Sequence, residues 1–417
     1  MASILSQAAF ESYSDVEVLG DLKRLRLAFD GIDDEALMRK LERKRGHGRD
    51  DFPVRVMWNL FIAMIVFCHK SVESFRRELD RNPTLCKMCG LHYDPHRKNH
   101  IPPARVFSGF TKRLKSFQDE VDRMFGDLTR QLAELIPGFG KNAAGDGKYL
   151  DSAAKRPPTK SGETDDRSEN DAKFSTKEYK YRGADGKDHV KKETHFGFKV
   201  HVICDVPTEL PIIFSVSEAN ADERAEMVKL INLLAPGQRA AMDTIALDRG
   251  YDSIDMIRAL KHAGIIPIID IRDCWKDGES TKQYKNTNMI YTFDGKVFYE
   301  DNDGPHKMSY EGYDCQKKCL RYSYKGKTYK IYTSYDERVF LPIARDSKKF
   351  KRLYKARTTV ERLNSRLDND YMFEEKEIRG IQKMRLMASL SLLIMNGMAV
   401  AKARQGIKSI RSLKRAG

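Results

Sequence analysis

The sequence predicts a mixed α/β protein with a helical region at its start and strands alternating with helices in its middle. Three features carry that prediction. Apolar residues recur at helical spacing through residues 1–140, β-rich runs bounded by turn residues begin near residue 145, and the turn signals DG and KG join further strand-like runs between 273 and 340. A chain of 417 residues is long enough for more than one domain.

The composition restricts the partners of the chain. Its 75 Lys and Arg residues exceed its 60 Asp and Glu residues, which gives a formal net charge of +15 and a pI near 9.3. The basic residues also gather in runs, at 41–50, 348–357 and 408–417. Such clustering favours a polyanionic partner such as nucleic acid over a protein that is merely soluble and basic.

The cysteines and the first residues indicate a cytoplasmic protein. Seven cysteines, an odd number, are scattered without the pattern of a disulfide framework. The opening run MASILSQAAFESYSD lacks both a charged leader and an adequate apolar segment. In a bacterium such a protein would have direct access to DNA.

Residues 1–140 are expected to form a helical DNA-binding domain. The run 54–70 has the length and apolar content of a helix. The run 104–135 repeats apolar residues at i, i+3 and i+4 as one segment, and Pro102 and Pro103 favour its start. A helix-turn-helix could lie here, and its second segment carries four candidate DNA contacts: Arg105, Lys112, Arg113 and Lys115.

The middle of the chain predicts an ordered core. The charge-rich stretch 155–194 is expected to be a loop or flexible excursion, and Pro207 with Thr208 marks a hairpin. Without that stretch the order strand, strand, strand, helix, strand, helix, strand is ribonuclease-H-like. Its members are the runs 145–152, 195–206, 210–218, 221–236, 240–248, 253–264 and 265–272.

The core is expected to continue beyond an insertion. Residues 273–340 predict an all-β insertion because strand-like runs there are joined by tight-turn signals. The core would then consist of 141–272 together with 341–404, and a basic tail would follow at 405–417.

The second part of the core predicts a helix bearing Glu361 and another helix from about 379 to 404. Within the latter, 384–401 is apolar enough to be considered as a membrane span. One side of it is polar, however, and carries Arg385, Ser389 and Asn396. A packed helix is therefore favoured over a span, and no membrane partner is expected.

Three acidic residues stand where a metal site could form. Asp146 lies near the first core strand and Asp248 ends the fourth, and sites in open α/β sheets form outside the carboxyl ends of strands. Glu361 follows Tyr354 and Arg357 at i, i+3, i+7, which predicts a phenol, a guanidinium and a carboxylate on one helix face. Carboxylates suit Mg²⁺, and paired ions can activate a hydroxyl and stabilise a leaving oxygen.

Asp151 is the alternative for the first acid. It lies five residues after Asp146, so on a continuous strand the two side chains face opposite sides of the sheet. Asp146 is preferred because Gly145 and Gly147 leave its surroundings open to a backbone phosphate.

Several separated motifs resemble those of one family. The chain resembles the DDE transposases of bacterial insertion sequences, and most closely the subgroup with a Y-x2-R-x3-E-x6-K signature. The motifs occur in the family's order and cover most of the chain from about 50 to 404. They are DGK (146–148), HFGFKVHVICD (195–205), TELP (208–211), EANADE (218–223), LDRGYDS (247–253) and R-x-S-x-x-F-x-x-x-Y-x-x-R-x-x-x-E-R (345–362).

The resemblance implies a function. Asp146, Asp248 and Glu361 would be catalytic ligands of Mg²⁺, with Mn²⁺ as an alternative, and Tyr354 and Arg357 would contact the DNA of the element end. The protein would cleave double-stranded DNA at terminal inverted repeats and join the freed strand to target DNA, as a homodimer.

The expected DNA-binding set also includes Lys351, Arg352 and Arg362, since the basic run 348–357 flanks the proposed catalytic face. One position departs from the signature, because its Lys should fall where this chain has Asp368. Two alternatives therefore stay open. One is a catalytically inactive, transposase-derived, sequence-specific DNA-binding protein, and the other is a nuclease of the same fold that does not join strands.

For several further residues a structural role is preferred over a role in binding a ligand. His201 is expected to be packed in a strand. Buried or incidental thiols are expected in place of zinc sites, because the spacing is unlike that of zinc fingers. The candidate zinc ligands are Cys86, Cys89, His92 and His96, and separately Cys274, Cys315 and Cys319.

Overall fold

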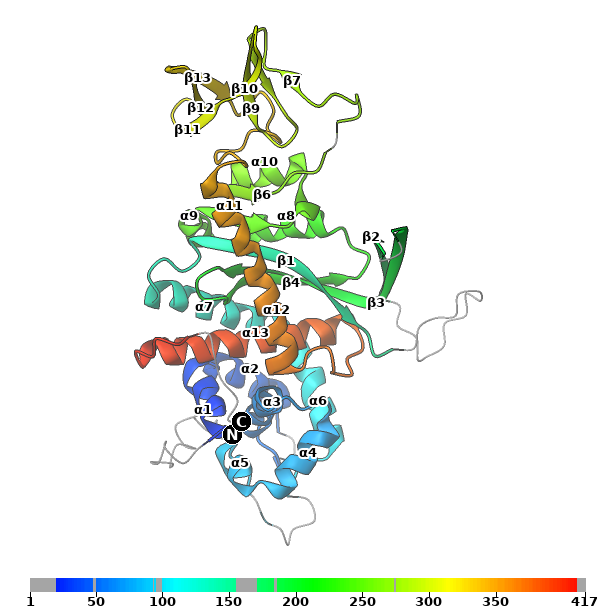
Figure 1. Ribbon diagram of the computed structural model, residues 1–417. Coiled ribbons are helices and arrows are strands. Elements are labelled where there is room, and N and C mark those ends of the chain that lie inside the picture. Colours follow the sequence, from blue (N-terminus) through cyan, green and yellow to red (C-terminus); the bar gives the residue numbers. More distant parts are fainter. Residues whose placement is uncertain are drawn as a thin grey trace.

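The computed structural model describes residues 20–47, 50–92, 94, 100–154, 171–183, 186–273 and 275–410. Its fold is mixed α/β with a helical N-terminal region, as the sequence predicts. Figure 1 shows three layers along the long axis: the N-terminal helices, a central sheet with helices on both faces, and a β-rich part at the far end.

The N-terminal region consists of helices packed around the fully buried α3. They are α1 (Leu22–Gly31), α2 (Glu35–Arg45), α3 (Val54–Val66), α4 (Val72–Arg81), α5 (Pro83–Met88), α6 (Ala104–Lys115) and α7 (Gln118–Leu135). The prediction of one helical segment over 104–135 is wrong in one respect, since Ser116 and Phe117 separate α6 from α7. Apolar recurrence continues across that break because both helices bury their apolar side in the same core.

Helix α13 (Ile381–Arg404) lies between the N-terminal helices and the sheet (Figure 1). Of the helices in the described ranges it alone is long and apolar enough to cross a membrane, and 94% of that window is buried inside the protein. The expectation of a packed helix is confirmed. Its predicted polar side meets α7 and the sheet: Ser389 Oγ donates to Asp122 Oδ1 at 3.1 Å, and Asn396 Nδ2 donates to Pro211 O at 3.1 Å.

The end of α1 approaches α13 at a pair of glycines. A Cβ atom at Gly31 would lie 1.8 Å from the carbonyl oxygen of Gly397, and a Cβ atom at Gly397 would lie 2.6 Å from Ile32 Cγ1. Only glycine leaves room for this crossing, which locks α1 onto α13.

The central sheet has six strands: β1 (Asn142–Asp151), β2 (Lys173–Arg182), β3 (Asp188–Asp205), β4 (Pro211–Glu218), β5 (Thr244–Leu247) and β6 (Ile266–Ile269). Strand β3 pairs antiparallel with β1 on one side and with both β2 and β4 on the other. Strands β5 and β6 run parallel to β1. The order through the core is therefore β4-β3-β1-β5-β6.

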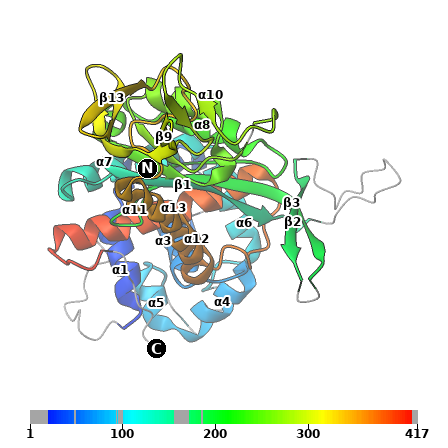
Figure 2. The ribbon, with the colours of Figure 1, turned by 45° about the horizontal axis from the view of Figure 1, so that its top comes forward.

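Part of the predicted loop over 155–194 is a hairpin instead. Strand β2 pairs with the first half of β3 from Lys173 opposite Gly197 to Arg182 opposite Asp188, and this arm projects from the sheet (Figures 1 and 2). Toward its tip the arm is exposed on both faces, and its strands carry charged residues, Thr and Tyr without the apolar face of a core strand. Residues 155–170 lie outside the described ranges.

Helices cover both faces of the sheet. Helices α8 (Glu223–Leu233), α9 (Pro236–Ala241) and α10 (Ile254–His262) connect β4, β5 and β6. Asp222 caps α8 by accepting from Ala225 N at 2.9 Å. On the face of the sheet opposite α8 lie three consecutive elements: α11 (Lys348–Tyr354), a 3₁₀ turn η4 (Lys355–Arg357) and α12 (Thr358–Tyr371).

Residues between β6 and α11 hold only strands and turns within their described part. Strands β7 to β13 form one four-stranded and one three-stranded sheet around a separate apolar core, and they span Lys282–Tyr332. Two arginines attach this part to the main sheet. Arg338 Nε donates to buried Asp252 Oδ1 at 3.1 Å, and buried Arg345 donates to Ile269 O at 3.0 Å.

Candidate active site

Asp146 and Asp248 lie side by side on neighbouring parallel strands. In the register of β1 with β5, Gly145 is opposite Leu247, so the next residues on both strands are the two aspartates. A Cβ atom at Gly145 would meet Leu247 at 2.9 Å and Met227 of α8 at 3.1 Å. Because side chains alternate along a strand, Asp146 and Asp248 belong to the opposite face, which α11, η4 and α12 cover.

The Asp146 carboxylate is partly buried among charges of both signs. Burial raises its pKa to about 6, and the nearby carboxylates of Glu223 and Asp248 act in the same direction. The Gly147 N–H, which donates to Oδ1 at 2.8 Å, and Lys177 act against them. A carboxylate that is costly to ionise next to a second carboxylate is a place where a bound cation would relieve repulsion.

Glu361 approaches this face from the first turn of α12. The predicted single helix face of Tyr354, Arg357 and Glu361 is only partly right, because Tyr354 ends α11, Arg357 ends η4 and Glu361 lies in α12. The three remain linked: the Arg357 guanidinium is 5.8 Å from the Tyr354 ring centre, and its Nη1 donates to Glu361 Oε1 at 2.9 Å. Burial raises the pKa of the Tyr354 phenol, and the nearby carboxylate of Asp248 raises it further.

The three predicted acids do not form a complete cation cage. Over the described ranges, no three His, Cys, Asp or Glu side chains are placed together so that they could hold a metal ion. Asp146 and Asp248 are adjacent, while Glu361 is exposed and its carboxylate is engaged by Arg357. The donor set of carboxylate oxygens fits Mg²⁺, and Glu361 would have to leave Arg357 to join it.

Glu223 is a further carboxylate that sequence reasoning did not select. It opens α8, where Lys199 Nζ lies 3.0 Å and Lys177 Nζ 3.5 Å from its Oε1. Burial raises the pKa of Glu223, but the two lysines outweigh that effect and lower it overall. Only its place in EANADE, the motif after β4, could have pointed to it.

Lys148 is a second residue that sequence reasoning did not select. It follows Asp146 by two positions on the same strand face, and its Nζ lies 2.9 Å from Asp368 Oδ2 on α12. Glu374 also pairs with it. Asp368, which stands where the signature has Lys, is therefore paired with Lys148 of β1. This ion pair joins the strand of Asp146 to the helix of Glu361.

The predicted DNA-binding cations fall into two groups. Lys351 and Arg352 are exposed on α11. Arg362 instead donates to Glu209 Oε1 at 2.5 Å and to Thr359 Oγ1 at 2.9 Å, so it also joins α12 to the turn between β3 and β4.

Asp151, the alternative first acid, and His201 lie in other surroundings. Asp151 is exposed at the end of β1 and hydrogen-bonds His195 Nδ1 at 3.2 Å. His201 is fully buried against Ser217 Oγ at 2.9 Å, as expected for a packed residue, and burial lowers its pKa to about 4.

The thiols of the first candidate zinc site are buried. Burial raises the pKa of Cys86 to about 12 and that of Cys89 well above its ordinary value, which opposes the thiolate form that zinc needs. His96 and Cys274 lie outside the described ranges, and Cys315 is exposed while Cys319 is buried.

Comparison with known proteins assigns the family. A model described as "Transposase DDE domain" matches residues 163–396, which is 234 of the 417 residues. The chain therefore belongs to the transposase DDE domain family. Asp248 and Glu361 lie inside the matched residues, and Asp146 lies before them.

Two further comparisons add little. A cryo-EM structure of the piggyBac transposase synaptic complex with hairpin DNA aligns with a TM-score of 0.32 at 13% identity, over 97% of this chain and 88% of that chain. A likeness of that size carries no argument about this protein. No curated protein matches the sequence.

Proposed function

We propose that this protein is a metal-dependent DNA transposase that cleaves DNA at element ends and transfers the freed strand into target DNA. The observation that carries the proposal is the parallel register that sets Asp146 beside Asp248, on the face covered by the helix of Glu361. Membership of the transposase DDE domain family supports the same reading.

The topology favours a ribonuclease-H-like core. Strands β4, β3 and β1 are antiparallel neighbours, and β5 and β6 continue the sheet parallel to β1 with helices in the connections. The two aspartates then occupy the first strand and the first of the added parallel strands, and the third acid arrives on a helix after the insertion. This arrangement was expected from the order of elements in the sequence.

The carboxylates of Asp146, Asp248 and Glu361 would hold Mg²⁺ or Mn²⁺, which would supply water activation and stabilisation of the leaving oxygen. The chain's own residues prepare that site. Burial and like charge keep Asp146 poised to exchange a proton for a cation. Arg357 holds Glu361 aside until a phosphate of the element end takes its guanidinium, and Tyr354 lies next to both.

The partners follow from this chemistry. Lys351, Arg352 and the exposed side of Arg362 would contact the phosphates of double-stranded DNA carrying terminal inverted repeats, in the cytoplasm of a bacterium. Two ends must be brought together, so we propose a homodimer on DNA.

The test is strand cleavage and joining by the full chain with Mg²⁺, on a plasmid carrying the inverted repeats that flank the gene. Asp146→Asn and Glu361→Gln should each reduce cleavage by at least about 100-fold, whereas Asp151→Asn, on the same strand as Asp146, should not. Binding without cleavage by the unaltered protein would instead indicate an inactive DNA-binding protein. Cleavage without joined products would indicate a nuclease.

A further inference from the structure

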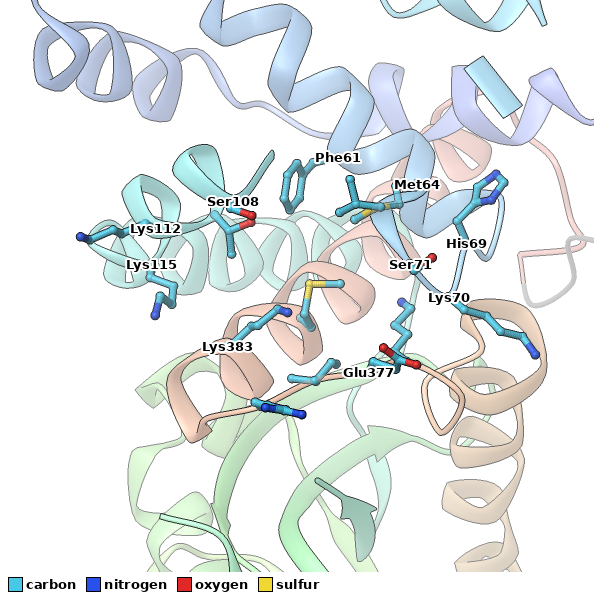
Figure 3. Close-up of a pocket in the computed structure, with 16 residues that line it drawn as sticks. Phe61, Met64, His69, Lys70, Ser71, Ser108, Lys112, Lys115, Glu377 and Lys383 are labelled. Carbon is cyan, nitrogen blue, oxygen red and sulfur yellow. The ribbon is translucent and has the colours of Figure 1, made fainter. Parts of the chain in front are cut away.

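A basic hollow opens between the N-terminal helices and α13, away from the carboxylates. It has a volume of about 470 Å³ and lies between α3, the turn that follows it, α6 and the start of α13. Figure 3 shows Lys112 and Lys115 on the α6 wall and Lys383 on the α13 wall. Its lining holds six Lys and Arg residues against one acid, Glu377; the cations are Lys70, Lys112, Lys115, Lys376, Arg379 and Lys383.

The hollow continues along the helices. An adjoining hollow, also of about 470 Å³, shares Lys112 and Lys115 and extends past Gln118 and Arg385. Together they form what we call the α6–α13 groove. Two adjoining hollows offer room for a row of anionic groups rather than for one small ion only.

Most of its positive charge is not neutralised by the protein. Arg385 pairs with Asp122, and Lys70 pairs with Glu375. Across the described ranges, no ion pair joins Lys112, Lys115 or Lys383 to a carboxylate. Burial lowers the pKa of Lys383, and the neighbouring charges of Lys115 and Arg379 lower it further, while Glu377 acts in the opposite direction without outweighing them.

The buried side chain of Lys376 gives independent support for an anion in the hollow. Its side chain lines the hollow although the residue is only 8% exposed, and its Nζ has no hydrogen-bond partner among the described residues. Its nearest aromatic contact is the Phe373 ring, with the centre 5.6 Å away. A buried ammonium without an acceptor is costly, and an anion in the hollow would supply the missing acceptor.

We propose that the α6–α13 groove binds phosphate groups, and that they belong to a DNA backbone. Lys112 and Lys115 on α6 and Lys383 on α13 provide the attraction, and Lys376 provides a buried donor for one phosphate oxygen. This rests on the proposed function only in naming DNA as the source of the phosphates. A free nucleotide or pyrophosphate presents the same chemistry.

The first test measures binding of a short duplex of arbitrary sequence to the full chain in EDTA, so that cleavage plays no part. The variant K112Q/K115Q/K383Q should bind at least about 10-fold more weakly at low salt. Its log–log salt dependence should be shallower by about 2 to 3, since each lost phosphate contact removes about 0.9. The matched control K141Q/K229Q/R130Q removes the same charge from surface ion pairs elsewhere and should change both quantities far less.

Equal losses in the two variants would overturn the proposal, because only overall charge would then matter. The variant K112R/K115R/K383R should retain binding, which guards against a folding defect. A failure of the catalytic proposal would leave these results in EDTA unchanged, so the two proposals fail separately.

The second test requires no substitution. Reductive methylation of the unaltered protein, followed by mass spectrometry, should show Lys112, Lys115 and Lys383 protected by the duplex, with Lys229 unprotected. The same experiment is repeated with pyrophosphate in place of the duplex. If a low concentration of pyrophosphate protects these lysines and displaces DNA, the groove binds a free phosphate ligand instead. Protection by neither probe would refute the proposal.

Discussion

Arg357 and Glu361 form an ion pair across the first turn of α12, with 2.9 Å between Nη1 and Oε1. In the proposed site that carboxylate is also the third metal ligand, so the guanidinium and the cation compete for it. A DNA phosphate that binds Arg357 would release Glu361. Metal and DNA are therefore expected to bind with positive coupling.

Arg357→Gln should strengthen metal binding in the absence of DNA while weakening binding of the element end. The ion pair is partly exposed, so we expect a gain of about threefold in Mn²⁺ affinity, close to what an exposed pair contributes. Electron paramagnetic resonance titration with Mn²⁺ measures it. Arg26→Gln, which removes a similar i, i+4 pair with Asp30 on α1, is the control. An unchanged Mn²⁺ affinity in Arg357→Gln would show that the pair does not restrain Glu361.

Asp146→Asn should stabilise the metal-free protein at neutral pH. Burial, assisted by Glu223 and Asp248, raises the folded-state pKa to about 6, above the ordinary value of 3.8. Between those values the folded protein holds a proton that the unfolded chain has released, so ionised Asp146 lowers stability as pH rises to about 6. Urea unfolding in EDTA at pH of about 7.5 should show a gain on the order of 1–2 kcal/mol that vanishes below pH of about 4. Asp151→Asn should show no such gain, and a gain that persists in acid would contradict the assignment.

The Lys148–Asp368 pair should position α12 relative to β1. Lys148→Asp places a carboxylate beside Asp368 and Glu374, and we expect loss of about 1–3 kcal/mol in stability and reduced cleavage. The double variant Lys148→Asp with Asp368→Lys restores opposite charges and should recover much of both. Unfolding free energies of the single and double variants give the coupling between the two side chains. Additive effects would mean that the pair contributes nothing specific.

Gly31→Ala should strongly destabilise the protein. Its Cβ would lie 1.8 Å from Gly397 O, and neither backbone can move without separating α1 from α13. We expect a loss of about 2–4 kcal/mol. Gly126→Ala on α7 is the matched control, since a Cβ there meets nothing within 4 Å and should stabilise by about 0.5–1 kcal/mol. Similar melting temperatures for the two variants would disprove the tight crossing.

Periodicity in the sequence was enough to place the elements whose apolar face meets a core. Examples are α3, α13 and the pairing of β3 with β4 across the turn at Pro207. It failed for β2, because much of that arm is exposed and no apolar stripe marks it. It also missed the break at Ser116, where two helices share one buried side.

Within the site, Asp146 and Asp248 could be paired from the sequence because Asp146 lies in the first strand-like run of the core and Asp248 ends the run 240–248. Glu223 and Lys148 could not be assigned to the site from the sequence. Their roles depend on which face of the sheet their side chains lie on and on partners far along the chain, such as Asp368. The engagement of Glu361 by Arg357 was hidden for a different reason. Helical spacing shows that the two can meet, but not that they pair with each other in the absence of substrate.

The glycine crossing has a consequence for how the molecule is made. Gly397 must be synthesised before α1 can form this contact, so most of the described residues have to leave the ribosome before α1 reaches α13. Until then the side of α1 that packs on α13 stays uncovered, although its contacts with α3 can already form. A nascent chain halted before α13 would therefore expose apolar side chains that are buried in the folded protein.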